Sequence, residues 1–286
     1  LSCIMRLETS IGEVYFKAVP PFMTQEVVVM RELPRQHPEL LPPLLATDVE
    51  RGWMLMPDFG DDLLLHTPDL SRWEEALRHC AQMQVAQVGH VPDWLARGCP
   101  DRRLPRMVAL IEPLITVSTQ MFLGSPQGLS KAEIEGLHAI AMKLQLLCAN
   151  LAGYSVPQTL IHGDLGGNIL VQDDRYIFFD WTDVCIAHPF FDMATIIETV
   201  FDESVIKNQT DVRTRLRDAY LEPWTTYETM PRLVHAFELS TSLGALHQAM
   251  SYMWILMNVA EDARWELEHG LVTWLRRLLQ LLPPGN

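Results

Sequence analysis

Residues 1–60 alternate short apolar runs with turn signals. The runs Ser2–Leu7 and Val14–Val19 predict two strands joined by a tight turn. The apolar spacing over Met23–Gln36 predicts a helix, for which Thr24 is a suitable N-cap residue. After a proline-rich break, Trp53–Met56 predicts a short buried strand. This part of the chain therefore predicts a small sheet with one helix.

Beyond Gly60 the apolar residues recur at a spacing of three and four, which is typical of helices. Ser130 and Glu133 form a capping box that opens one long helix. We expect the apolar stripe of that helix to lie in the core: Ile134, Leu137, Ala141, Leu144, Cys148 and Leu151. Further helices are predicted over Asp69–Val88, Phe190–Phe201, Thr210–Tyr220, Arg232–Val259 and Asp262–Leu282. The large side chains near the carboxyl end are expected to be mostly core: Tyr252, Trp254, Met257, Trp265 and Trp274. The pattern predicts an α+β fold, with a small β-rich part followed by a larger helical part.

A polar cluster interrupts the apolar pattern between residues 159 and 180. Short runs at Thr159–Ile161 and Ile169–Val171 bracket it, and a third run after the turn signal Asp173-Asp174 ends at Asp180. We expect Asp164, Asn168 and Asp180 to face one another across a strand–loop–strand hairpin. Carboxylate and amide oxygens suit Mg²⁺, a hard cation. His162-Gly163-Asp164 alone is also an ordinary turn composition, but a second acid after a hairpin of suitable length favours a functional site.

Composition excludes several classes of protein. The 286 residues carry a formal net charge of −14, which argues against a nucleic-acid partner. An acidic surface of this kind gives weak support to a cationic small-molecule substrate. Five scattered cysteines without a Cys-x-x-Cys pair indicate reduced thiols in a cytoplasmic protein. The apolar run at Met253–Met257 is too short to span a bilayer, so no membrane partner is expected. No P-loop motif is present.

The segment from His162 to Ala194 resembles the aminoglycoside phosphotransferase / choline kinase family, small-molecule kinases with the protein-kinase fold. The residues that carry the resemblance are His162, Asp164, Asn168, Asp180 and Asp192-Met193-Ala194. It implies a two-lobe fold, with a nucleotide-binding N-lobe at residues 1–60 and a helical C-lobe at 61–286. It also implies a phosphotransferase that uses ATP and Mg²⁺ and acts on a hydroxyl of an aminoglycoside-, amino alcohol- or sugar-like molecule.

The resemblance assigns roles to these residues. Asp164 would be the catalytic base, and Asn168 and Asp180 would hold Mg²⁺. His162 is expected to support the loop by hydrogen bonding and packing. Asp192 would brace the catalytic loop through backbone N–H groups, although an acid at this position also suits a helix cap.

Nucleotide contacts are implied in the N-terminal part. Lys17 alone reads as a snorkelling lysine at the edge of a strand, but the resemblance makes it the lysine that holds the ATP phosphates, with Glu26 as its carboxylate partner and Glu32 as the competitor. The stretch after Trp53–Met56 would be the hinge. There Met56, Pro57 and Phe59 are expected to contact adenine, with Phe59 keeping an N–H that Pro57 lacks.

Two departures from the family pattern bear on activity. Asp164 and Asn168 are four positions apart, where the family has five, and one residue spans up to roughly 3.5 Å of chain. The loop then takes another path, Asn168 is a poor ligand, or a residue is absent from the sequence. The chain also opens directly on strand-like sequence, so we expect the phosphate-covering hairpin upstream of Leu1. The alternative function is a kinase-fold protein that binds a nucleotide or a partner without turnover.

Overall fold

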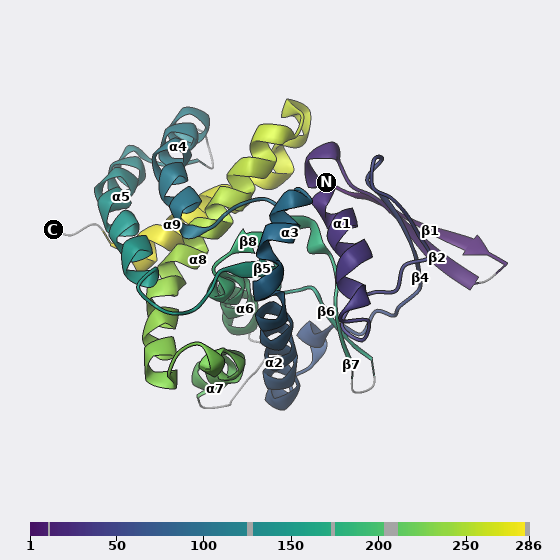
Figure 1. Ribbon diagram of the computed structural model, residues 1–286. Helices are drawn as coiled ribbons and strands as arrows, with labels where there is room; N and C mark the ends of the chain where they lie inside the picture. The colour runs from purple at the N-terminus through teal and green to yellow at the C-terminus, as the bar shows by residue number, and fades with distance from the viewer. Residues whose placement is uncertain (11, 125–127, 173–174, 203–210, 284–286) are drawn as a thin grey trace. The chain divides into compact units, whose positions relative to one another are not determined.

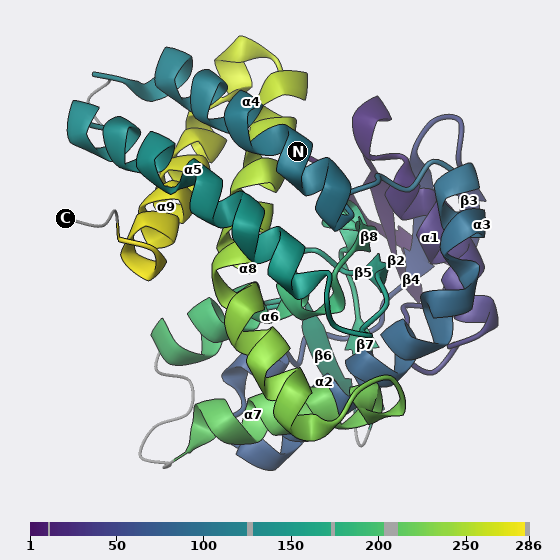
Figure 2. The same cartoon turned by 60° about the vertical axis from the view of Figure 1, so that its left-hand side comes forward.

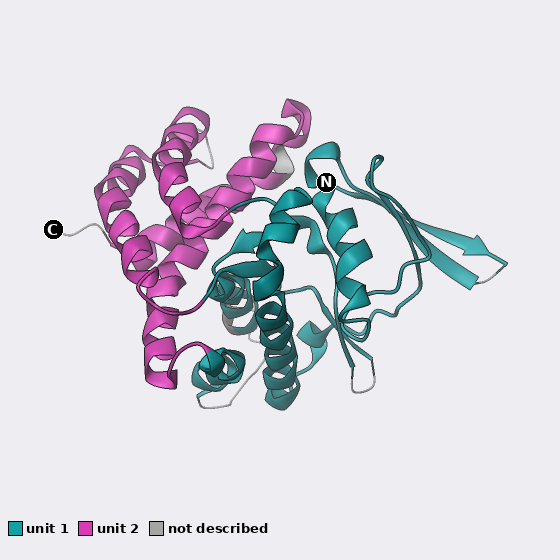
Figure 3. Ribbon diagram, viewed as in Figure 1, with its two compact units in different colours: residues 1–101, 157–226 teal, residues 102–156, 227–286 magenta. Residues whose placement is uncertain are grey.

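The computed structural model describes residues 1–10, 12–124, 128–172, 175–202 and 211–283. Packing divides the chain into two compact units. The first unit combines residues 1–101 with 157–226, and the second combines 102–156 with 227–286 (Figure 3). This division differs from the predicted lobes at 1–60 and 61–286, and the lobe boundary stays a prediction.

The first unit contains a four-stranded antiparallel sheet with strand order β1-β2-β4-β3 (Figure 1). Its strands are β1 (Cys3–Thr9), β2 (Gly12–Ala18), β3 (Ala46–Asp48) and β4 (Trp53–Pro57). Both strands predicted before residue 20 are confirmed, whereas the edge strand β3 was not predicted because three residues are too few for a pattern. The prediction that Trp53–Met56 is buried is wrong for Trp53, which is 41% exposed, because alternate strand residues face opposite sides and only Met54 and Met56 face the core.

The helix predicted over Met23–Gln36 is present in three parts. A 3-10 turn at Pro21–Met23 precedes α1 (Gln25–Glu32), and a second 3-10 turn at Leu33–Arg35 follows it. The predicted N-cap at Thr24 is wrong. Because the preceding turn already holds Thr24 in a helical conformation, its hydroxyl donates back to the Pro21 carbonyl at 3.4 Å instead of capping α1.

In the described part of the first unit, four further α-helices and two small sheets accompany this sheet. The helices are α2 (Leu70–Gln87), α3 (Val91–Ala96), α6 (Met193–Ile197) and α7 (Val212–Leu221). The strands are β5 (Thr159–Ile161), β6 (Ile169–Gln172), β7 (Arg175–Phe178) and β8 (Cys185–Ala187). The predicted strand–loop–strand hairpin around Asp164 is corrected. β5 pairs with β8 and β6 pairs with β7, so the strands on the two sides of the Asp164 loop do not pair with each other. The turn signal Asp173-Asp174 between β6 and β7 lies outside the described residues, as does part of the predicted turn before Gly12.

The second unit is helical in the part that the structure describes (Figure 2). Its helices are α4 (Leu104–Phe122), α5 (Lys131–Leu151), α8 (Met230–Asn258) and α9 (Trp265–Leu281). The capping box is confirmed, since Ser130 and Glu133 each accept the other's backbone N–H at the start of α5. The apolar stripe of α5 is also confirmed as core.

The prediction that the aromatic and methionine residues near the carboxyl end are mostly core is wrong. Tyr252 and Trp274 are half-buried, and the side chain of Trp265 lies outside the described part of the structure. Trp254 and Met257 are 45% and 57% exposed, whereas Met253 and Leu256 are buried. Residues 254 and 257 share the face of α8 that points away from the core, because positions three apart lie on one side of a helix. Among the described residues, no helix has the length and apolar character needed to cross a bilayer.

Candidate active site

Lys17 in β2 lies at the centre of an ion-pair cluster in the first unit. Its side chain is buried, and its Nζ atom lies 2.6 Å from Glu26 Oε1 and 2.6 Å from Asp180 Oδ1. Glu26 belongs to the first turn of α1, and Asp180 follows β7. The competitor Glu32 instead pairs with Arg31 and Arg35. The expected partner of Lys17 is therefore Glu26, and Asp180 is a second partner.

For Lys17 and Asp180 the neighbouring charges outweigh the cost of burial, whereas for Glu26 burial is the larger effect and raises the pKa. Burial lowers the pKa of Lys17, but the adjacent carboxylates of Glu26 and Asp180 raise it above its ordinary value, so the ammonium keeps its charge. Burial also raises the pKa of Asp180, and the Lys17 ammonium outweighs that effect and lowers the pKa below its ordinary value. Asp180 is therefore ionised at neutral pH.

Asp180 adopts a strained backbone conformation. Its φ of 58° and ψ of 65° lie in the left-handed region, which a non-glycine residue rarely adopts. Lys17 and the Thr182 hydroxyl both bind its carboxylate, and Thr182 also bonds to Glu26 at 3.1 Å. These contacts hold the Asp180 carboxylate in one place. A strained backbone conformation persists only where surrounding contacts fix it in this way.

Asp192 braces the loop that carries Asp164. Its two carboxylate oxygens accept the backbone N–H of His162 at 2.9 Å and of Gly163 at 2.7 Å. These two bonds agree with the bracing interpretation, which stays a prediction. Asp192 makes no side-chain cap to α6, so the capping interpretation is wrong. Gly163 has a φ of 89°, and a Cβ atom there would lie 2.3 Å from the Asp183 carbonyl oxygen, so only glycine fits.

His162 supports the same loop from inside. Its ring is buried, packs on the Trp181 ring and donates from Nε2 to the Phe179 carbonyl at 2.8 Å. Burial lowers the pKa of His162 to about 4, so the ring is neutral at pH 7. The expectation of a supporting contact for His162 agrees with this geometry.

A buried polar chain continues from Asp192 into α2 and α7. Gln84 donates from Nε2 to Asp192 Oδ2 at 2.7 Å. The Tyr220 hydroxyl lies 2.6 Å from Gln84 Oε1 and 2.7 Å from the Pro189 carbonyl oxygen. Two helices distant in sequence, α2 and α7, are thus connected to the loop through Asp192.

Asp164 lies on this loop with its side chain exposed. The surrounding chain desolvates the carboxyl and, together with the negative charges of Asp183, Asp180 and Asp192, raises its pKa to about 7. Because the side chain is open to solvent, water screens part of this effect. The direction of the shift is that of a carboxylate able to accept a proton near neutral pH.

Asn168 closes the short loop. Its side-chain Nδ2 donates to the Asp164 carbonyl at 2.7 Å, and its own carbonyl accepts the Phe179 N–H at 3.1 Å. The four-residue spacing therefore forms a compact turn whose second end lies beside the residue that precedes Asp180. The amide nitrogen of Asn168 is bonded within the loop, so the side-chain oxygen is the atom of Asn168 that suits a metal ion.

The predicted hinge residues follow the same sheet. Met56 and Pro57 pair with Tyr15 and Val14 of β2, close to Lys17. The Phe59 ring lies 6.3 Å from the Phe179 ring, just before Asp180, and the Phe59 carbonyl accepts from Gln172. Adenine contacts at these residues stay a prediction.

Sequence reasoning missed several residues of the site. Thr182 contacts Lys17, Glu26 and Asp180, and Thr195 accepts the N–H groups of Leu165 and Gly166 at 3.1 Å. The spacing of Thr195, one turn after Asp192, was an available signal. Gln84 carried none, because a buried glutamine is indistinguishable in sequence from any other helical residue.

The residues available for a metal ion are oxygen donors. Within the described parts of the chain, no group of three or more His, Cys, Asp or Glu side chains is arranged to hold one. Asn168 directly precedes β6 and Asp180 follows β7, so the two residues lie at neighbouring ends of this strand pair. The acidic side chains near them outnumber the Lys17 ammonium. This set fits Mg²⁺, which takes one or two protein oxygens and completes its shell with water and phosphate.

Comparison with known proteins agrees with this geometry. The model of the phosphotransferase enzyme family (APH) matches residues 123–233, which include the Asp164 loop, Asp180 and Asp192. The predicted family resemblance is confirmed. No curated protein matches the chain.

Solved structures share the fold at low sequence identity. An ethanolamine kinase from Plasmodium vivax has a TM-score of 0.70 and 9% identity, over 99% of this chain and 80% of that one. A choline/ethanolamine kinase family protein from Mesorhizobium loti has a TM-score of 0.59 and 16% identity, over 97% and 88%. An amicoumacin kinase in complex with AMP-PNP and Ca²⁺ has a TM-score of 0.60 and 11% identity, over 99% and 86%. The predicted fold class, a protein-kinase-like α+β fold, is confirmed.

Proposed function

We propose that this protein is an ATP- and Mg²⁺-dependent phosphotransferase that acts on a hydroxyl of a small molecule. The observation that carries the proposal is the buried Lys17, which joins Glu26 and Asp180 in the same unit as the braced Asp164 loop. A lysine held by two carboxylates is a fixed point charge for phosphate oxygens. The match to a phosphotransferase family and the kinase names of the structural neighbours support it.

Asp164 is assigned the role of orienting the acceptor hydroxyl and accepting its proton. Phosphoryl transfer asks for positioning and charge stabilisation more than for covalent chemistry by the protein. The brace from Asp192 fixes the loop backbone on both sides of Gly163. The raised pKa of Asp164 brings the carboxylate close to the pH at which a base works best.

Asp180 and Asn168 are assigned to hold Mg²⁺. When bound, this ion supplies positive charge that offsets the negative charge of the phosphates. Such an ion would offset the excess of acids, because Lys17 is bonded to both Glu26 and Asp180, and Asp164 is close enough to Asp180 to feel its charge. Met56, Pro57 and Phe59 are assigned to the adenine. The amicoumacin kinase solved with AMP-PNP and Ca²⁺ supports the use of a nucleotide and a divalent cation.

The acceptor belongs to the class of aminoglycoside-, amino alcohol- or sugar-like molecules. The neighbours named as ethanolamine and choline/ethanolamine kinases support an amino alcohol. The net charge of −14 favours a cationic acceptor. A location in the cytoplasm stays a prediction.

The test measures ATP consumption with a panel of amino alcohols, aminoglycosides and sugars, together with AMP-PNP binding by calorimetry. Asp164→Asn is expected to lower turnover by about 10²–10⁴-fold, the usual contribution of a catalytic base, while AMP-PNP binding stays unchanged. Asp93→Asn, at an exposed position on α3, is the matched control. Nucleotide binding without any ATP consumption would favour the alternative of a non-catalytic kinase-fold protein. Absence of nucleotide binding would contradict the proposed phosphotransferase and would leave only the form of the alternative that binds a partner.

A further inference from the structure

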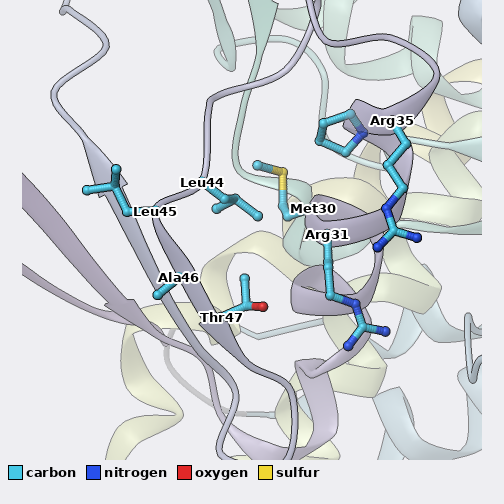
Figure 4. Close-up of a pocket in the computed structure, with 8 residues that line it drawn as sticks. Met30, Arg31, Arg35, Leu44, Leu45, Ala46 and Thr47 are labelled. Carbon is cyan, nitrogen blue, oxygen red and sulfur yellow. The ribbon is translucent and has the colours of Figure 1, made fainter.

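A cavity of about 340 Å³ lies in the first unit, between α1 with its following 3-10 turn and the segment that leads into β3 (Figure 4). It is separate from the candidate active site, because Lys17, Glu26, Asp164 and Asp180 do not line it. Its size falls in the range of sites for small ligands. A role for this cavity is therefore a question apart from phosphoryl transfer.

One side of the cavity is cationic. Arg31 and Arg35 end on the same side in Figure 4, and both are bonded to Glu32, each at 2.8 Å. Each guanidinium has five N–H donors, and the bond to Glu32 uses one of them. The remaining donors are available to a ligand, since the two arginine side chains are 44% and 70% exposed. The three charged groups together carry a net charge of +1, in a chain with 22 basic and 36 acidic residues.

The other side of the cavity is apolar. Met30 is buried beneath it, and Pro34 and Leu44 are half-buried at its wall. Leu45 is 46% exposed at the opposite rim from the arginines. A ligand that covers these side chains removes apolar surface from water, which favours binding.

We propose that this cavity binds a small carboxylate that carries an apolar body. One carboxylate matches the net charge of +1 and the planar geometry of a guanidinium, which binds carboxylates through paired N–H donors. A phosphate dianion would leave excess negative charge beside Glu32. A neutral molecule of the same shape would leave the cationic side without a partner. The ligand class is thus an alkyl or aryl monocarboxylate.

The experiment uses the whole chain and three probes with the same alkyl body: octanoate, octanol and octyl phosphate. Calorimetry is expected to show saturable binding of one octanoate per chain, at least tenfold tighter than octanol and octyl phosphate. In spectra of ¹³C-methyl-methionine protein, the Met30 signal is expected to shift during the octanoate titration, and Met30→Leu identifies that signal.

The variant Arg31→Met/Arg35→Met is expected to weaken octanoate binding at least tenfold. Both side chains are exposed, so the fold is expected to persist, which the thermal unfolding midpoint checks. Arg78→Met is the matched control, because Arg78 is also partly exposed and bonded to one acid, Glu222, away from the cavity. The proposal is overturned if octanoate shows no saturable binding, if octanol binds equally tightly, if the double variant binds as before, or if Met30 does not shift. None of these outcomes depends on phosphotransferase activity.

Discussion

Lys17 is a buried cation whose two carboxylate partners come from distant parts of the chain. Glu26 is nine residues away and Asp180 is 163 residues away. Breaking a buried ion pair by removing one partner costs about 3–5 kcal/mol, because it leaves the other charge uncompensated. Substitution of Lys17 is therefore expected to lower the free energy of unfolding, and this loss has to be measured separately from any loss of nucleotide binding.

The acidic side of the turnover pH profile is expected to follow Asp164. A base works when deprotonated, so turnover should rise with pH through about 7 and then level off. Asp183 is one of the negative charges that raise this pKa. Asp183→Asn is therefore expected to move the acidic limb of kcat/KM to lower pH. Asp93→Asn should leave the limb in place, and a shift to higher pH in Asp183→Asn would refute the assignment.

At the scale of elements, the Asp164 loop is held by contacts from outside its own strands. Asp192, at the end of a 3-10 turn before α6, holds the backbone, and Gln84 of α2 holds Asp192. Tyr220 of α7 bonds to Gln84 in turn. The loop geometry is thus a property of several packed elements, and a substitution two contacts away from Asp164 is expected to change it.

Gln84→Met is the test of this connection. It removes two buried hydrogen bonds, one to the Tyr220 hydroxyl and one to Asp192 Oδ2, while the Pro189 carbonyl and the His162 N–H remain as their other partners. The loss of these two bonds should lower the free energy of unfolding by about 1–3 kcal/mol. It is also expected to lower turnover about tenfold or more, with AMP-PNP affinity unchanged. Gln87→Met is the control, because Gln87 is equally buried on α2 but bonds to Gln36 and Trp94. Equal turnover in the two variants would show that the chain of contacts does not position the loop.

At the scale of the whole molecule, the distribution of charge leads us to expect that nucleotide binding depends on a divalent cation. The acids near Lys17 outnumber it, and the chain as a whole carries a net charge of −14. A triphosphate would therefore meet repulsion unless a cation offsets part of the negative charge. The expected dependence follows from the fold, since it needs Asp164, Asp180 and Asp192 close to one another.

The unfolding midpoint should report this dependence directly. AMP-PNP with Mg²⁺ is expected to stabilise the protein by about 2.7 kcal/mol at a ligand concentration 100 times the Kd. The same nucleotide with EDTA in place of Mg²⁺ should give no increase in Tm. Lys17→Met is expected to abolish the increase with Mg²⁺, judged against its own lower midpoint. An equal increase in EDTA would contradict the proposed metal site.

The sequence by itself determined the features that depend on neighbouring residues. The capping box at Ser130, the buried stripe of α5 and the His162–Asp164 motif are all local, because hydrogen bonds and helical periodicity act over a few positions. The family motif added the expectation that Lys17, Glu26 and Asp180 act together, and the structure places them in contact.

Only the tertiary structure decided which distant groups meet. The pairing of β5 with β8, the exposure of Trp254 and the bond from Gln84 to Asp192 all depend on packing between elements. A residue's type does not state its partner when that partner lies a hundred positions away, as Gln84 and Asp192 do. Packing therefore decided how the Asp164 loop is held, and local sequence decided only that a loop with these side chains exists.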